Sequence, residues 1–153
     1  PQAYDFPRTF IHETDRLQFS FSGLKTAVRY QVVGPGKHDF SKLSLEEQTV
    51  ADLAASFQAA VVDVLVAKAI AAVRKTGMKR ICVGGGVAAN KKFRSQLGEA
   101  MSAENCELHI APLELCTDNA VMGAIATERC RAGESESLDL DITPGLQRIP
   151  AGK

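Results

Sequence analysis

The chain has 153 residues, of which 45% are hydrophobic and 24% are charged, and its 18 basic and 18 acidic side chains give a formal net charge of zero. This composition is typical of one ordinary globular domain, and no uncharged apolar run approaches the roughly 20 residues of a membrane span. The balanced charge argues against a freestanding nucleic-acid-binding domain, which usually carries a basic excess. The four cysteines have no C-x-x-C spacing, so we expect reduced thiols in a cytoplasmic protein.

The N-terminal part begins without a clear periodic pattern. Residues 1–16 mix aromatic and polar side chains, and because the chain does not start with methionine we expect a fragment of a longer protein. Residues 19–23 alternate in polarity as a strand does, and residues 24–32 follow with the pattern of a helix. Gly-Pro-Gly at 34–36 ends that pattern.

A long helix is predicted over residues 45–76, which contain no Gly or Pro. Ser44-Leu45-Glu46-Glu47 fits a capping box at its start, and Gly77 stands where a C-terminal cap is expected. A helical wheel places four polar residues within about 40° of one another: Asp52, Ser56, Asp63 and Arg74. The rest of the circumference is largely apolar, so we expect a helix that is buried on several sides. Gln58 and Lys68 lie off the polar stripe, and we interpret them as side chains that extend from the core edge to solvent, with a functional role as the alternative.

After the long helix, short apolar runs alternate with helical patterns. The predicted elements are a strand at 80–83, a helix at 90–101, a strand at 106–111 that Pro112 ends, and a helix from 116 to 132 that Gly133 stops. This order predicts a parallel α/β unit with right-handed crossovers, in which ligands bind at the carboxyl ends of the strands. Residues 84–86 and 115–119 both fall at that edge.

Two segments at this edge are candidates for chemistry. Gly84-Gly85-Gly86 can bring main-chain N–H groups close to a ligand, and the start of the next helix favours an anion such as a nucleotide phosphate, although a plain strand-to-helix connection is the simpler interpretation. Thr117-Asp118-Asn119 places a carboxylate at a helix start, where it suits a hard cation and, more simply, a helix cap. The sequence has no H-E-x-x-H, P-loop or G-x-S-x-G motif.

Three blocks of sequence occur in an order that resembles one known family. They are Phe19-Ser20-Phe21-Ser22-Gly23-Leu24-Lys25-Thr26, then Gly85-Gly86-Val87-Ala88-Ala89-Asn90 followed by Phe93-Arg94, then Cys116-Thr117-Asp118-Asn119-Ala120-Val121-Met122. The chain is similar over residues 17–146 to the tRNA N6-adenosine threonylcarbamoyltransferases, long catalogued as O-sialoglycoprotein endopeptidases or glycoproteases. Three ordered blocks are more specific than any one of them, and they favour functional roles for the glycines and for Asp118.

The resemblance implies an actin-like ATPase fold of the sugar-kinase and Hsp70 type, in which two related lobes close on a nucleotide. This chain resembles the later part only, as a fragment of the C-terminal lobe with a long helix. The implied organisation is an N-terminal segment over 1–43 with the Ser-Gly-Leu-Lys block, the C-terminal α/β lobe over 44–146, and a tail over 147–153.

The resemblance also implies a reaction, the transfer of a threonylcarbamoyl group from threonylcarbamoyl-adenylate to N6 of the adenosine beside the tRNA anticodon, with release of AMP. Gly85, Gly86 and Asn90 inherit adenylate binding, the asparagine through a bidentate amide. Asp118 inherits a ligand position on one divalent metal ion, iron or zinc, which would polarise the acyl phosphate. The family's His-x-x-x-His metal pair is absent from this sequence, and we assign no catalytic base.

The leading interpretation is therefore part of a tRNA-modifying transferase, inactive alone, which works with partner subunits and without a membrane. The alternatives are a non-catalytic paralogue that dimerises with the enzyme, the historical metalloendopeptidase and, more weakly, a sugar kinase. Five basic residues form a hypothetical RNA-facing patch: Lys25, Arg29, Lys91, Lys92 and Arg94.

Overall fold

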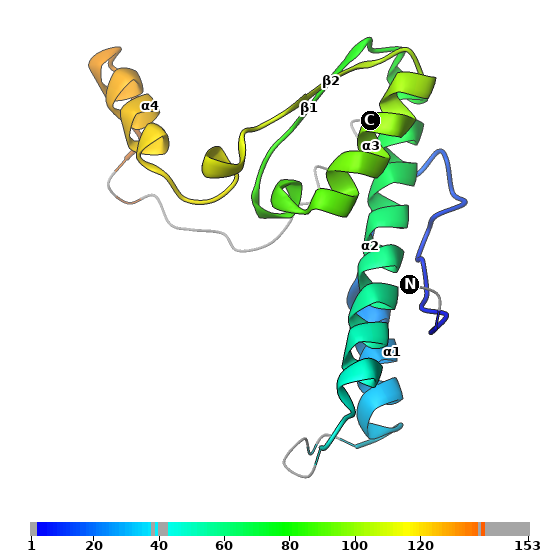
Figure 1. Ribbon diagram of the computed structural model, residues 1–153. Coiled ribbons are helices and arrows are strands. Elements are labelled where there is room, and N and C mark those ends of the chain that lie inside the picture. Colours follow the sequence, from blue (N-terminus) through cyan, green and yellow to red (C-terminus); the bar gives the residue numbers. More distant parts are fainter. Residues whose placement is uncertain (1–2, 38, 40–42, 138, 140–153) are drawn as a thin grey trace. The chain divides into compact units, whose positions relative to one another are not determined.

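The computed structural model describes residues 3–37, 39, 43–137 and 139, and the chain forms two units divided between Thr117 and Asp118. The first unit contains α1 (Ser22–Val33), α2 (Glu47–Thr76), β1 (Arg80–Val83), α3 (Lys91–Ala103) and β2 (Glu107–Ile110), and the second contains α4 (Ala120–Arg131) (Figure 1). The predicted tail over 147–153 lies outside the described residues.

The central element of the first unit is α2, a helix of 30 residues. Its predicted end is confirmed, because Gly77 adopts a left-handed conformation with φ 66° and donates its N–H to the Val73 carbonyl at 2.9 Å. The predicted capping box is wrong. Glu46 occupies the N-cap position in an extended conformation and makes no side-chain cap hydrogen bond. Leu45, just before it, packs against the core cluster beside α1 instead of forming the first turn of α2.

The flanks of α2 are covered on several sides, as predicted. One core cluster, built on Val62 and Val73, packs α2 against α3 and the sheet, and a second, built on Leu53 and Ala60, packs it against α1 and the N-terminal segment. Length and composition alone would let α2 cross a membrane. Its place in two cores of the same unit is instead that of a central helix.

The N-terminal segment before α1 is fastened to α2 by polar side chains. The Tyr4 N–H donates to Ser56 Oγ at 3.2 Å, and Arg8 Nε donates to Asp63 at 2.8 Å. Lys68 makes the strongest attachment. Its side chain is 5% exposed, and its ammonium donates to the carbonyls of Phe10, Glu13 and Arg16 at 2.6, 2.8 and 2.7 Å. The expectation that Lys68 extends to solvent is therefore wrong.

The start of α1 also differs from the prediction. Residues 19–23 do not form a strand, because the helix already begins at Ser22 and no strand among the described residues pairs with this segment. The rings of Phe19 and Phe21 instead form a pair with centroids 5.5 Å apart, and Phe21 packs against the core cluster that contains Leu24. The predicted end is confirmed by Gly34, whose φ is 87°.

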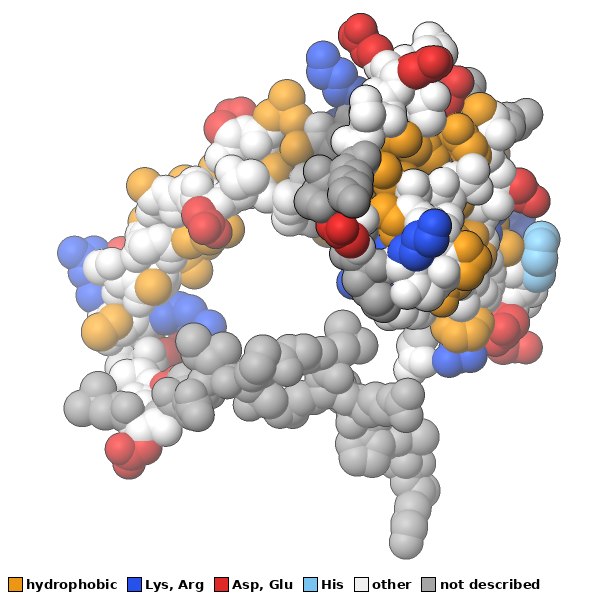
Figure 2. Space-filling view, turned by 90° about the horizontal axis from the view of Figure 1, so that it is seen from below, with side chains coloured by type: hydrophobic (Ala, Val, Ile, Leu, Met, Phe, Trp, Pro, Cys, Tyr) orange, Lys and Arg blue, Asp and Glu red, His pale blue; other side chains and the backbone are white. Residues whose placement is uncertain are grey.

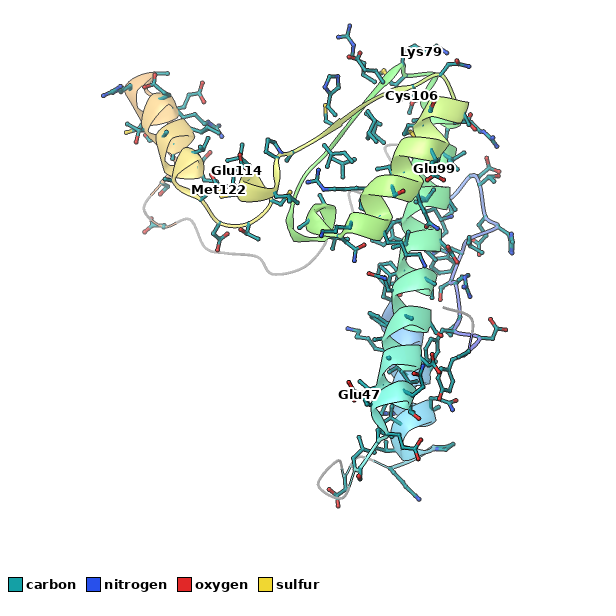
Figure 3. The ribbon with its side chains drawn as sticks, viewed as in Figure 1. Glu47, Lys79, Glu99, Cys106, Glu114 and Met122 are labelled. Atoms are coloured by element: carbon teal, nitrogen blue, oxygen red, sulfur yellow. The ribbon has the colours of Figure 1, made fainter. Side chains whose placement is uncertain are left out.

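β1 and β2 form a two-stranded parallel sheet in the register Arg80↔Glu107 to Val83↔Ile110, and α3 connects them. This confirms a parallel α/β unit. Cys106, labelled in Figure 3, stands between α3 and β2 and is 7% exposed within the core. All four cysteines are free thiols, as expected.

In the second unit α4 begins four residues later than predicted. A 3-10 turn at Leu113–Leu115 and a bend precede it, and Asn119 is its N-cap, with Oδ1 accepting the Val121 N–H at 3.0 Å. Asp118 is therefore not the cap. The predicted stop is confirmed by Gly133, whose φ is 80°.

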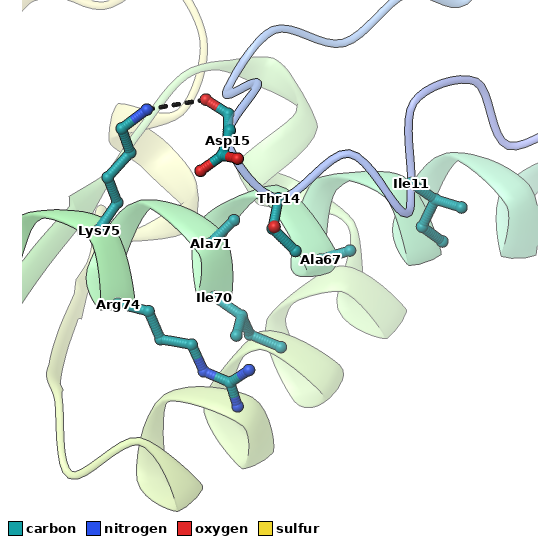
Figure 4. A pocket seen from close by; sticks show the side chains of 8 residues that line it. All are labelled: Ile11, Thr14, Asp15, Ala67, Ile70, Ala71, Arg74 and Lys75. Carbon is teal, nitrogen blue, oxygen red and sulfur yellow. Dashed lines mark hydrogen bonds between the residues drawn. The ribbon is translucent and has the colours of Figure 1, made fainter.

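The surface of the first unit has two apolar features away from the sheet. Figure 2 shows hydrophobic side chains exposed at the end formed by α1 and the start of α2, where Tyr30 and Val50 are 42% and 49% exposed. A groove of about 530 Å³ lies between the N-terminal segment and α2, where the Lys75 ammonium donates to the Asp15 carbonyl at 2.8 Å (Figure 4). Neither feature contains a predicted site residue.

Candidate functional site

The glycine turn follows directly from the end of β1. The last hydrogen bond of the sheet runs from the Ala111 N–H to the Val83 carbonyl at 2.9 Å, after which Gly85 adopts φ 86°, a conformation that residues with a Cβ rarely take. A 3-10 turn at Gly86–Ala89 then begins with the Ala88 N–H donating to the Gly85 carbonyl at 2.9 Å. A Cβ built on any of the three glycines meets no atom within 4 Å. The main chain is therefore open to a ligand.

The charge near this turn favours an anion. The 3-10 turn separates the glycines from α3, whose first turn contains Lys91 and Lys92 and no acidic residue. Helix starts usually carry acidic side chains, which the macrodipole stabilises, so two lysines here work against the helix. Their positive charge adds to that of the free N–H groups at the helix start.

Asn90 joins the turn to two helices. Its Oδ1 accepts the Phe93 N–H at 3.0 Å and caps α3, while its Nδ2 donates to Gln58 Oε1 on α2 at 2.8 Å. An amide has two N–H groups and two lone pairs, so one of each remains for a ligand. Gln58 is half-buried, and beyond the predicted position at the core edge its amide oxygen binds Asn90.

A small hollow lies beside this amide pair. It measures about 200 Å³, and apolar side chains form most of its wall. Its lining residues are Phe57, Gln58, Val61, Val62, Val87 and Asn90. An apolar wall with two amides on it suits a flat heterocycle that has polar atoms on its edge.

The predicted metal position is less complete. Asp118 is exposed and is the first residue of the second unit, whereas the glycine turn and Asn90 belong to the first. Within the part of the chain that the structure describes, no three His, Cys, Asp or Glu side chains gather into a set that could hold a metal ion. One carboxylate does not satisfy the four or more ligands that iron or zinc requires. These residues alone do not fit the metal.

The hypothetical RNA-facing patch loses one member. Arg94 is half-buried and donates its guanidinium hydrogens to main-chain carbonyls and a thiol inside the first unit. Its charge is therefore turned inward. Lys25 and Lys91 are exposed, and their contact with RNA stays a prediction.

The observed arrangement is an α/β unit whose strand, open glycine turn and capped helix form a ligand-accessible edge. The family model for tRNA N6-adenosine threonylcarbamoyltransferase (TsaD) matches residues 1–125. The chain belongs to this family, as the three sequence blocks predict.

Individual relatives agree with the family match. A tRNA N6-adenosine threonylcarbamoyltransferase of Rhodopirellula baltica is 53% identical over 156 residues, which cover 96% of this chain and 43% of that protein. Proteins of the same name from Methylibium petroleiphilum and Bordetella pertussis are 47% and 50% identical, over 88% and 85% of this chain and 37% of each relative. The chain thus spans about two fifths of the length of these relatives.

Proposed function

We propose that this chain is the adenylate-binding part of a tRNA-modifying transferase. The reaction moves a threonylcarbamoyl group from threonylcarbamoyl-adenylate to N6 of the adenosine beside the anticodon. Family membership supports the class of reaction. The observation that carries the site is the open main chain at Gly85 and Gly86 beside a hollow with two amides on its wall.

The proposed division of labour follows from the geometry. The first N–H groups of the 3-10 turn bind the phosphate of the adenylate. Lys91 and Lys92, in the first turn of the helix that follows, add positive charge. The flat base enters the hollow between Phe57 and Val87, where the remaining N–H and lone pair of Asn90 recognise its edge. Asn90 thus combines capping with recognition.

The other parts of the proposal rest on the family alone. They are an actin-like ATPase fold, a cytoplasmic location, tRNA and partner subunits as partners, and iron or zinc on Asp118. The metal ligands beyond Asp118 would come from residues that the described part of this chain does not supply. For that reason we propose that the chain is inactive by itself.

One observation favours a second candidate. Asn90 has a complete structural explanation as a cap and as a bridge to Gln58. In a non-catalytic paralogue that acts by dimerising with the enzyme, Asn90 would need only these two structural roles. The two candidates differ in whether the glycine turn binds adenylate.

The experiment is a calorimetric titration of AMP, or of a non-hydrolysable threonylcarbamoyl-adenylate mimic, into the full-length protein and two alanine variants. In Gly86→Ala the new methyl enters open space and the backbone is not strained, so folding is expected to be unchanged while the approach to the main chain is blocked. We expect binding to weaken about tenfold to a hundredfold, as for loss of one or two hydrogen bonds to a charged group.

Gly98→Ala is the matched control. It adds a methyl in open space within α3, away from the turn, and is expected to leave binding unchanged while it stabilises the helix. A folded wild-type protein that binds neither ligand would contradict the proposed function and favour the non-catalytic paralogue. Equal binding by wild type and Gly86→Ala would exclude the turn as the adenylate site.

A further inference from the structure

Arg94 connects the two segments that leave the carboxyl ends of the strands. Its Nε donates to the Ala88 carbonyl at 2.5 Å, in the 3-10 turn after the glycines. Its Nη2 donates to the Ala111 carbonyl at 2.5 Å and to Cys116 Sγ at 3.3 Å, in the segment after β2. One side chain on α3 therefore binds the main chain on both sides of the sheet edge.

An arginine suits this position better than a lysine. The guanidinium is planar and presents donors in fixed directions, so two N–H groups can reach two carbonyls at once, whereas a lysine ammonium is a single point of charge. The helix also holds the side chain in place, because Arg94 lies one turn after the cap and its N–H donates to the Asn90 carbonyl at 3.0 Å. The strand ladder has already ended at this point, with the bond between Ala111 and Val83. Beyond this bond, the Arg94 guanidinium connects the 3-10 turn after β1 to the segment after β2.

We propose that Arg94 is a positioning residue for the glycine turn and for the segment after β2. It holds the Ala88 carbonyl, and with it the 3-10 turn that follows Gly85, in a fixed relation to Ala111. Cys116, the third partner, precedes Thr117 and Asp118 in the sequence. We call the three hydrogen bonds from Arg94 to Ala88, Ala111 and Cys116 the brace. The effect of this brace on adenylate affinity rests on the proposed function, but the brace itself does not.

The cysteines of this chain provide a readout that does not depend on activity. Cys116 is 2% exposed, and its Sγ contacts the Pro112 carbonyl at 3.3 Å in addition to Arg94. Cys106 is 7% exposed at the opposite end of β2 and has no bond to Arg94. Release of the brace should expose the first thiol and not the second, whereas global unfolding exposes both.

The experiment compares iodoacetamide alkylation rates, resolved by peptide mass spectrometry, in the full-length wild type, Arg94→Met and Arg94→Lys. We expect Cys116 to react about tenfold to a hundredfold faster in Arg94→Met, with Cys106 unchanged, because all three hydrogen bonds of the guanidinium are lost, two of them to the segment after β2. Arg94→Lys should keep only part of the protection of Cys116 from alkylation, because lysine keeps the positive charge but cannot donate to both carbonyls in the fixed directions of a guanidinium. Arg80→Met is the control, because Arg80 pairs with Glu107 across the same two strands at their other ends.

Each outcome decides the inference. An unchanged Cys116 rate in Arg94→Met, or equal acceleration of Cys106, would show that Arg94 does not brace this edge. Titration of the same variants with AMP separates the two proposals. If wild type binds AMP and Arg94→Met binds it equally well while Cys116 is released, Arg94 does not position the turn. If wild type does not bind AMP, the proposed function fails, and the alkylation pattern still decides the brace.

Discussion

Replacement of Lys68 by methionine should detach the N-terminal segment from α2. The ammonium has three N–H donors and uses each on a carbonyl, those of Phe10, Glu13 and Arg16, at 2.6 to 2.8 Å. Methionine keeps most of the stem's volume but offers the carbonyls no donor. The same substitution thus tests the hydrogen bonds with little change in packing.

The size of the effect follows from two opposing terms. Hydrogen bonds to a charged group stabilise by about 1.5–3 kcal/mol each, so three of them give about 4.5–9 kcal/mol before other costs. Lys68 is 5% exposed, and burial of its charged ammonium costs several kcal/mol. The methionine variant does not carry this desolvation cost. Water can also hydrate the carbonyls once the segment loosens. We expect a net loss of about 2–4 kcal/mol in the free energy of unfolding.

The assay is urea unfolding of the full-length protein followed by circular dichroism, with amide hydrogen exchange over residues 8–16. Lys75→Met is the matched control, because its exposed ammonium makes one bond to the Asp15 carbonyl, and we expect a loss within about 0.5 kcal/mol. Exchange in the segment should accelerate in the Lys68 variant and not in the control. If Lys68→Met unfolds at the same urea concentration as wild type with the segment still protected, the three hydrogen bonds do not hold it.

Substitutions at two further residues, Asn90 and Glu104, test polar contacts elsewhere in the first unit. Asn90→Ser keeps a good helix cap but loses the amide donors, so it should unfold close to wild type and bind AMP more weakly. Asn90→Ala should bind AMP more weakly and also lose about 1 kcal/mol in the free energy of unfolding. Equal AMP binding by wild type and Asn90→Ser would limit Asn90 to capping. The Arg74 hydrogen bond lowers the pKa of Glu104 below its ordinary 4.5, so its stabilisation is present above pH 4.5 and lost as pH falls through the lowered pKa. The difference in stability between wild type and Glu104→Gln should therefore disappear on acidification, and a difference that persists in acid would contradict this origin.

For α1, α2 and α4 the end of the helix could be predicted from the sequence, and its start could not. Gly34, Gly77 and Gly133 all adopt positive φ, which is a local requirement that the residue type itself reveals. The starts depend on tertiary packing. Leu45 packs against the core beside α1 and does not belong to the first turn of α2. The rings of Phe19 and Phe21 contact each other instead of pointing to opposite faces of a sheet.

The same contrast applies to the candidate site. The sequence pattern predicts where the turn at Gly85 and the start of α3 lie, whereas the capping role of Asn90 is found only in the structure. All partners of Lys68 and two of the three partners of Arg94 are main-chain carbonyls, which every residue carries, and those of Lys68 lie more than 50 positions away. No sequence signal marks such an acceptor, so the sequence favours solvent for Lys68, with a functional role as the alternative, and RNA for Arg94.

These inward-facing cations and amides share one consequence for the site. The turn is held from two directions, through Asn90 to Gln58 on α2 and through Arg94 to the segment after β2. α2 is itself fixed on another side by the attachment of Lys68 to the N-terminal segment. A main chain that must present N–H groups to a phosphate gains affinity when its geometry is set before the ligand arrives, because less conformational entropy is lost on binding. Glycines provide the access, and residues far from them in sequence provide the rigidity that the glycines lack.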